Sequence, residues 1–159
     1  MIRIDIPATS ANLGSGFDSL GIALTMCNRV WMEEADELKI TTTDKIKVPT
    51  DETNLIYWAA RHLYQICGKT LPGLHIIQEN NIPMARGLGS SSACIVAGIL
   101  GANRMLGSPM SQSDLINLAA QIEGHPDNTS PAISGGLVAS AMEGKRVYSV
   151  SVPVSGKIS

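Results

Sequence analysis

A glycine- and serine-rich segment between a predicted strand and a predicted helix constrains this chain most. The strand-like run covers residues 73–79, and the helical run covers residues 93–100, where apolar residues recur at helical spacing. The connecting segment reads Pro83, Met84, Ala85, Arg86, Gly87, Leu88, Gly89, Ser90, Ser91, Ser92 and Ala93. Glycines let the backbone approach an anion closely, and the unpaired N–H groups at the start of a helix attract phosphate. The segment therefore predicts a phosphate-binding loop.

Other interpretations of this segment compete with that one. Glycine and serine are common at helix starts, so the segment could be a flexible or helix-capping loop. A Walker A loop is excluded because no Gly-Lys-Ser/Thr ending is present, and the glycines do not fit the dinucleotide pattern G-x-G-x-x-G. If the loop binds phosphate, it is of a third kind, in which serine hydroxyls donate to phosphate oxygens or ligate Mg²⁺.

Two further motifs carry polar side chains suited to a site. The first, residues 7–18, contains Asn12 and Asp18, although such residues commonly only hydrogen-bond their own turns. The second, residues 123–128, begins with Glu123 at the end of a predicted helix. A carboxylate is disfavoured at that negative end of the helix dipole, so a bound cation such as Mg²⁺ would compensate it.

The three motifs in this order resemble the GHMP kinases, the small-molecule kinases named for galactose, homoserine, mevalonate and phosphomevalonate, and among them the homoserine kinases. The resemblance runs from Ile2 to about Val138. It implies an α+β fold, a two-layer α/β sandwich like domain 2 of ribosomal protein S5, for the ATP-binding domain at residues 1–159. It also implies that the family's C-terminal ferredoxin-like domain is absent from this sequence.

The implied reaction is the ATP-dependent phosphorylation of L-homoserine to O-phospho-L-homoserine in threonine biosynthesis. By resemblance, the ATP phosphates bind residues 83–93, and Ser91 and Glu123 hold Mg²⁺. The amino-acid end of the substrate would contact Asn12 and Asp18. Another GHMP kinase and a non-catalytic nucleotide-binding module remain as alternatives.

Asn128 and His125 have different expected roles in the reaction. Related mevalonate kinases place a base-like Asp where homoserine kinases have an Asn, and Asn128 matches that Asn. Since Asn cannot take a proton, it would orient the substrate hydroxyl while catalysis rests on alignment and charge stabilisation. The pKa range of histidine suits a general base, but we favour a structural role for His125.

Composition excludes several classes of protein. The sequence is 44% hydrophobic and 16% charged, which argues against disorder, and no apolar stretch is long enough to span a bilayer. A net charge of −2 gives no broad footprint for nucleic acid. Met1 leads into Arg3 and Asp5 rather than an apolar signal region, which predicts a cytoplasmic protein. A surface that would face the missing domain predicts self-association as a homodimer.

Periodicity and turn residues predict a largely antiparallel sheet with three helices. Pro7 is expected to end the first strand, and a capping box at Ser111–Asp114 to begin the third helix. The expected strands are 2–6, 21–25, 29–34, 38–42, 73–79, 137–142 and 146–152, and the expected helices are 55–66, 93–106 and 113–123.

Overall fold

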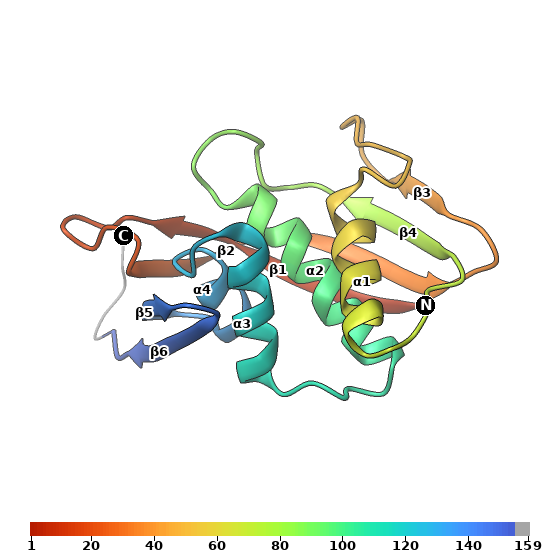
Figure 1. The fold of residues 1–159 in the computed structure, drawn as a ribbon. Helices are drawn as coiled ribbons and strands as arrows, with labels where there is room; N and C mark the ends of the chain where they lie inside the picture. The colour runs from red at the N-terminus through yellow and green to blue at the C-terminus, as the bar shows by residue number, and fades with distance from the viewer. Residues whose placement is uncertain (155–159) are drawn as a thin grey trace.

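The computed structural model describes residues 1–154 and shows one mixed sheet with helices on one of its faces (Figure 1). The two-layer α+β architecture is thereby confirmed. The strands are β1 (Ile2–Ala11), β2 (Leu20–Glu34), β3 (Lys39–Thr42), β4 (Leu74–Glu79), β5 (Leu137–Glu143) and β6 (Arg146–Val152). The helices are α1 (Leu55–Ile66), α2 (Ser90–Met105), α3 (Gln112–Glu123) and α4 (Thr129–Ser134).

Strand β2 is the centre of the sheet. It pairs with β1 along one edge, while on its other edge residues 29–34 pair with β4 and residues 20–22 pair with β5. The prediction of two separate strands at 21–25 and 29–34 was wrong. No glycine or proline interrupts the segment between them, and Cys27 and Asn28 remain paired with β1.

Strand β1 continues past Pro7 to Ala11, so the expected end at Pro7 was also wrong. The pairing register shifts between Pro7 and Thr9, which marks a β-bulge. Within residues 1–154, β1 pairs only with β2 and is an edge strand, where the missing proline N–H breaks no central ladder. As a result Thr9 lies inside the strand and is fully buried.

Strands β3 and β4 are parallel and are joined through α1, while the other strand pairs are antiparallel. Helix α1 begins and ends where the sequence predicted, with Asn54 as its N-cap. Helix α3 begins with the predicted capping box of Ser111 and Asp114. The hairpin of β5 and β6 is likewise confirmed.

Two helices differ from expectation. Helix α2 begins at Ser90 rather than Ala93, so the three serines form its first turn instead of the loop. Helix α4 was missed, because six residues containing a proline are too short to show an apolar period.

Helix α2 is the core helix of the domain. It is buried on almost every side, between α1 and the sheet. A Cβ at Gly98 would lie 2.3 Å from the Ile56 carbonyl oxygen, and one at Gly101 would lie 2.3 Å from Met32 Sδ. The two glycines thus allow α2 to approach α1 and β2 closely.

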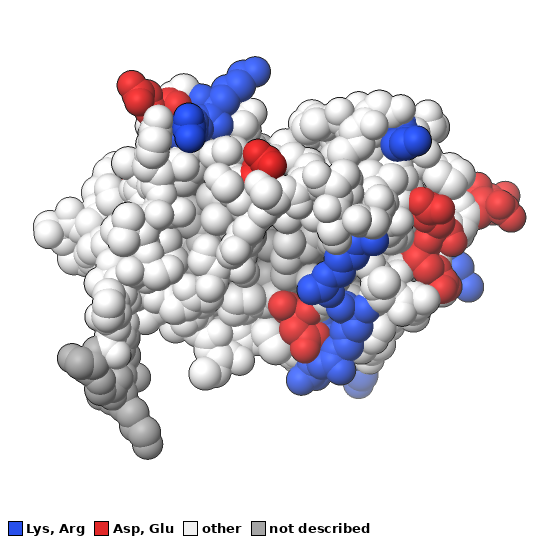
Figure 2. Space-filling view, turned by 90° about the horizontal axis from the view of Figure 1, so that it is seen from below, with Lys and Arg blue, Asp and Glu red and all other residues white. Residues whose placement is uncertain are grey.

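Three further features of residues 1–154 concern helix length, surface charge and the cysteines. No helix among them is long and apolar enough to cross a bilayer. On the face shown in Figure 2, acidic and basic side chains stand in mixed groups on a mostly uncharged surface. The three cysteines are free and half-buried.

Candidate active site

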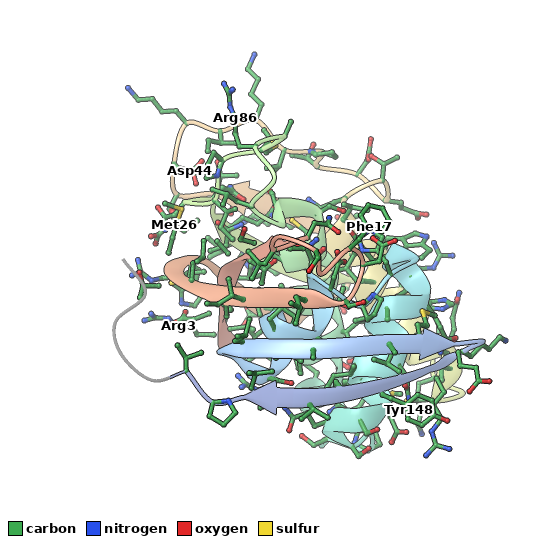
Figure 3. All side chains as sticks on the ribbon, turned by 90° about the vertical axis from the view of Figure 1, so that its left-hand side faces the viewer. Arg3, Phe17, Met26, Asp44, Arg86 and Tyr148 are labelled. Carbon is green, nitrogen blue, oxygen red and sulfur yellow. The ribbon has the colours of Figure 1, made fainter. Side chains whose placement is uncertain are left out.

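The predicted phosphate loop leaves β4 and reaches the start of α2. Residues 83–87 are exposed, and Arg86 extends outward from them (Figure 3). Ala85, Gly87 and Gly89 have φ values of 55°, 70° and 65°, in the left-handed region that favours glycine. This alternation bends the chain tightly around the N-terminus of α2.

The first turn of α2 presents backbone donors at that bend. The first intrahelical hydrogen bond runs from the Ala93 N–H to the Gly89 carbonyl oxygen at 2.8 Å, so the N–H groups of residues 90–92 precede it. The first turn carries no acidic side chain, and Gly89 makes no side-chain cap. These donors, at the positive end of the helix dipole, suit a phosphate group.

Gly89, Thr9 and Asn128 form a tightly packed cluster beneath the loop. The Thr9 hydroxyl donates to Asn128 Oδ1 at 2.8 Å, and the Thr9 N–H donates to the Leu88 carbonyl oxygen at 3.2 Å. A Cβ at position 89 would lie 2.1 Å from Thr9 Oγ1. The structure therefore places Asn128 directly against the phosphate loop. Sequence reasoning missed Thr9, because a buried threonine in a strand shows no pattern that distinguishes it from core.

Glu123 lies beside the first turn of α2. Its carboxylate accepts hydrogen bonds from Ser91 Oγ at 3.3 Å and Ser92 Oγ at 3.0 Å. Burial, with a smaller contribution from Glu123, raises the pKa of the Cys94 thiol to about 11, so this thiol is neutral at pH 7.

The donors around Glu123 suit one kind of metal. Residues 1–154 hold no group of three His, Cys, Asp or Glu side chains able to bind a metal. Mg²⁺ bound to a nucleotide needs only one or two carboxylates, because phosphate oxygens and waters complete its octahedron. One carboxylate flanked by two hydroxyls fits that demand.

Asp127 organises the loop that carries His125 and Asn128. Its Oδ1 contacts His125 Nδ1 and accepts the Asn128 N–H at 3.0 Å. The Asp127 side chain is 1% exposed whereas that of His125 is 41% exposed, so the carboxylate is the fixed partner. Its Oδ2 is buried without a hydrogen-bond partner within the described residues. Sequence reasoning gave Asp127 no role.

Asn12 and Asp18 lie in the loop between β1 and β2. Both have positive φ, and the Asp18 N–H donates to Asn12 Oδ1 at 2.9 Å. No hydrogen bond within residues 1–154 joins either side chain to Asn128. The structure thus brings the two predicted substrate residues together in one exposed turn, next to Phe17, whose side chain is 75% exposed (Figure 3).

A cleft of about 290 Å³ opens beside the first turn of α2. It lies between that turn, the end of β4 and the connection from β3 to α1. Its lining consists of Lys47, Val48, Pro49, Thr53, Asn54, Leu55, Gln78, Asn80, Ile82, Met84, Ala85, Ser90, Ser91 and Cys94. The cleft itself was not predicted, because its wall at residues 47–49 is an irregular polar connection.

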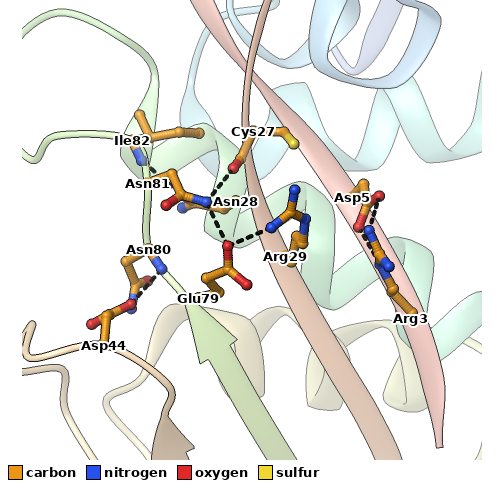
Figure 4. A network of polar contacts seen from close by, with 10 residues as sticks. All are labelled: Arg3, Asp5, Cys27, Asn28, Arg29, Asp44, Glu79, Asn80, Asn81 and Ile82. Carbon is orange, nitrogen blue, oxygen red and sulfur yellow. Dashed lines mark hydrogen bonds and ion pairs between the residues drawn. The ribbon is translucent and has the colours of Figure 1, made fainter.

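A polar network fixes the walls of this cleft (Figure 4). Asp44 accepts the N–H groups of Ile46 at 2.7 Å and Asn80 at 2.6 Å, which ties the β3–α1 connection to the end of β4. Asn28 Oδ1 accepts the Ile82 N–H at 2.8 Å and anchors the start of the phosphate loop on β2. Both walls are thereby held by side-chain bonds to main-chain groups.

Comparison with known proteins assigns this arrangement to a family. The model of the GHMP kinases N terminal domain matches residues 54–136, which is more than half of the chain. The chain belongs to the GHMP kinases. The matched region of this GHMP kinase includes the phosphate loop, Glu123, Asn128 and the part of the cleft lining from Asn54 onwards, while Lys47, Val48, Pro49 and Thr53 lie outside it.

Curated relatives of this GHMP kinase include homoserine kinases. That of Clostridium botulinum is 45% identical over 157 residues, which are 98% of this chain and 52% of the relative. That of Trichodesmium erythraeum is 49% identical over 150 residues, or 90% of this chain and 49% of the relative. The chain spans about half the length of the curated relatives it matches.

Solved structures share the fold of this GHMP kinase. The homoserine kinase of Cytophaga hutchinsonii superposes with a TM-score of 0.83 at 31% identity, covering 97% of this chain and 52% of that structure. The mevalonate kinase of Methanococcus jannaschii gives a TM-score of 0.72 at 15% identity, covering 96% and 56% respectively. The second likeness concerns the fold alone.

Proposed function

We propose that residues 1–159 supply the ATP-binding part of a homoserine kinase, which transfers the γ-phosphoryl group of ATP to the hydroxyl of L-homoserine. The observation that carries the proposal is the packing of Asn128 against the phosphate loop through Thr9, next to Glu123 at the start of α2. Identity of 45% to a curated homoserine kinase supports this substrate over others of the family.

The nucleotide has two complementary surfaces available. The phosphates would lie on the unpaired N–H groups of the first turn of α2 and on the loop glycines. The nucleoside would enter the adjoining cleft, where Val48, Pro49 and Leu55 offer apolar walls. With the nucleoside in the cleft on one side of this turn, the γ-phosphate would lie on the other side, towards Asn128.

Mg²⁺ would be held by Glu123 with help from Ser91, and when bound it neutralises charge on the phosphates. The Ser91 hydroxyl would turn from its present acceptor, Glu123 Oε2, to the ion. Replacing Glu123 by Gln keeps an acceptor oxygen for the serines and removes the charge. MgATP affinity of that variant should fall at least about tenfold while thermal stability changes little.

In the proposed transfer, the homoserine hydroxyl oxygen forms a bond to the γ-phosphorus as the bond from that phosphorus to the ADP oxygen breaks. The hydroxyl proton passes to an oxygen of the transferred phosphoryl group. Deprotonation of the nucleophile can lag in a loose transition state, so Asn128 needs only to align the hydroxyl. His125, held by Asp127, is assigned to support of this loop rather than to proton transfer.

Isothermal titration of the chain with MgATP, followed by an ADP-release assay with L-homoserine, tests the proposal. Saturable MgATP binding that Gly89→Asp abolishes, with ADP release only in the presence of homoserine, is the expected result. Turnover with mevalonate but not with homoserine would refute the substrate. MgATP binding without turnover in this chain, alongside turnover in a longer version, would agree with the proposal, whereas binding without turnover in both would favour the non-catalytic module. A folded sample that binds no MgATP would refute both.

The setting of the enzyme belongs to the same proposal. We infer a cytoplasmic protein that self-associates as a homodimer. Cell fractionation tests the location, and light scattering coupled to size-exclusion chromatography tests the dimer.

A further inference from the structure

We propose that Thr9 is a positioning residue that fixes the side-chain amide of Asn128, so that its Nδ2 end, and not its Oδ1 end, faces the acceptor hydroxyl. The inference rests on the proposed function for the identity of that hydroxyl. The geometry of the amide itself stands on contacts within the chain.

The first step concerns the oxygen of the amide. Asn128 Oδ1 accepts the Thr9 hydroxyl at 2.8 Å, across 119 positions of sequence. Thr9 is fully buried in β1, its N–H is bonded to the Leu88 carbonyl oxygen, and a β-branched side chain has few χ1 rotamers. The donor is therefore fixed in place before any ligand binds.

The second step concerns the space around that oxygen. A Cβ at Gly89 would lie 3.1 Å from Asn128 Oδ1, so this oxygen lies close against the glycine of the phosphate loop. The main chain of Asn128 is held as well, because its N–H donates to Asp127 Oδ1 and its carbonyl oxygen accepts the Ala132 N–H at 3.2 Å. Both ends of the residue are thus restrained.

The third step concerns the nitrogen. No acceptor within residues 1–154 bonds to Asn128 Nδ2, and the residue is half-buried rather than enclosed. An amide has one acceptor end and one donor end, so an occupied oxygen leaves a donor for the ligand. Asn128 then donates to the oxygen of the substrate hydroxyl and leaves the hydroxyl proton free to point elsewhere.

Two substitutions of similar size distinguish the effect of the Thr9 hydroxyl group from the effect of the side-chain shape. Thr9→Val keeps the shape and removes the donor, whereas Thr9→Ser keeps the donor and removes a methyl group. For transfer to homoserine, kcat of Thr9→Val should fall about tenfold to a hundredfold with KM for MgATP within about twofold, while Thr9→Ser retains most activity. In an Asn128→Ala background, Thr9→Val should change kcat by less than about twofold, because the group it positions is gone. Equal losses from Val and Ser, or an undiminished loss in that background, would overturn the proposal.

An NMR measurement decides the amide orientation even if the chain shows no turnover. In the uniformly ¹⁵N-labelled chain, the Nδ2 protons of Asn128 should show at most weak cross-peaks to the Thr9 side chain, and Thr9→Val should shift both resonances. The amide of Asn103 serves as internal reference, since both its ends are bonded to the main chain of Met110. Strong cross-peaks between the Nδ2 protons and Thr9 would show the opposite orientation, and unshifted resonances in Thr9→Val would show that the two side chains share no hydrogen bond. Either result would refute the inference. Absence of turnover alone would count against the proposed function and not against this geometry.

Discussion

Gly89 is required for two independent physical reasons. Its φ of 65° lies in the region that costs any other residue about 1–2 kcal/mol. A side chain there would also collide with Thr9 Oγ1, at 2.1 Å from the Cβ position. The collision would displace the one hydroxyl that holds Asn128.

We predict that Gly89→Ala lowers MgATP affinity at least about tenfold and destabilises the fold by about 2–4 kcal/mol, the sum of backbone strain and overpacking. Gly87→Ala is the matched control, because its φ is 70° but a Cβ there meets nothing within 4 Å. Gly87→Ala should therefore lose only the part of the stability that comes from backbone strain. Isothermal titration and chemical denaturation of both variants measure the difference, and equal losses would contradict the packing argument.

At the scale of elements, side-chain caps made the helices predictable and context made the strands difficult. The spacing of Ser111 and Asp114 predicts the start of α3, and the two residues form the predicted capping box. Pro7 is typical of the end of a strand, yet β1 continues through it with a β-bulge, because β1 is an edge strand. Local rules therefore succeeded where partners are local and failed where pairing with β2 decided the outcome.

The crossing of α1 and α2 gives a second prediction. Gly98→Ala gains about 1 kcal/mol of helix propensity. However, its Cβ would lie 2.3 Å from the Ile56 carbonyl oxygen, which the main chain cannot easily move. We expect a net loss of about 1–2 kcal/mol in urea unfolding.

Gly101→Ala is the comparison for that variant. Its Cβ would meet Met32 Sδ, the flexible side chain of a buried methionine, at the same 2.3 Å. The loss of stability should therefore be smaller than for Gly98→Ala. The opposite ranking would mean that the main chain at the crossing yields more easily than the core around Met32.

The β3–α1 connection supplies a pH-dependent prediction. Burial raises the pKa of Asp44, but the hydrogen bonds from Asn80 and Ile46 outweigh it and hold the pKa below its ordinary 3.8. A carboxyl group with a lowered folded-state pKa contributes stability that is present above its unfolded pKa and is lost as the pH falls through the folded pKa. The stability advantage of the wild type over Asp44→Asn should thus be larger at about pH 7 than at about pH 2.5. Urea titrations at both pH values test this, and an equal advantage at the two would exclude the ionised carboxylate as its source.

At the scale of the molecule, the site combines segments that could be recognised in the sequence, although the contacts between them could not all be predicted from it. The motifs around Gly89, Glu123 and Asn128 were recognisable from residue types and spacing, and the structure brings them together at one end of α2. The contact from Thr9 to Asn128 was not, because a pair 119 positions apart leaves no local pattern. The cleft depends on the same kind of distant contact, from Asp44 to Asn80.

Strand β6 lies at the end of the strand order next to β5, and most of its residues are exposed. Outside the hairpin itself, Val147 packs on Ile116 and Ala120 in a small separate cluster, and its N–H donates to Asn117 Oδ1 at 2.7 Å. Tyr148 and Val150 are exposed. Hydrogen exchange should therefore be faster in β6 than in β4, whose Leu74 and Ile76 are fully buried. Equal protection of the two strands would show that the hairpin opens only with the whole domain.

Strand β2 also dictates an order of assembly. Its pairing with β1 is local and can form as soon as the first 34 residues are available, whereas Leu20 must wait for Ala139 before β5 can join the other edge. Contacts between distant parts of a chain are slow to form, because the entropy cost of closing the loop comes before the contact can stabilise it. The proposed site, which needs Asn128 beside Thr9 and Gly89, thus becomes complete only late in folding. A fluorescent ATP analogue added during refolding would report completion of the domain, after the signal from β1–β2 pairing.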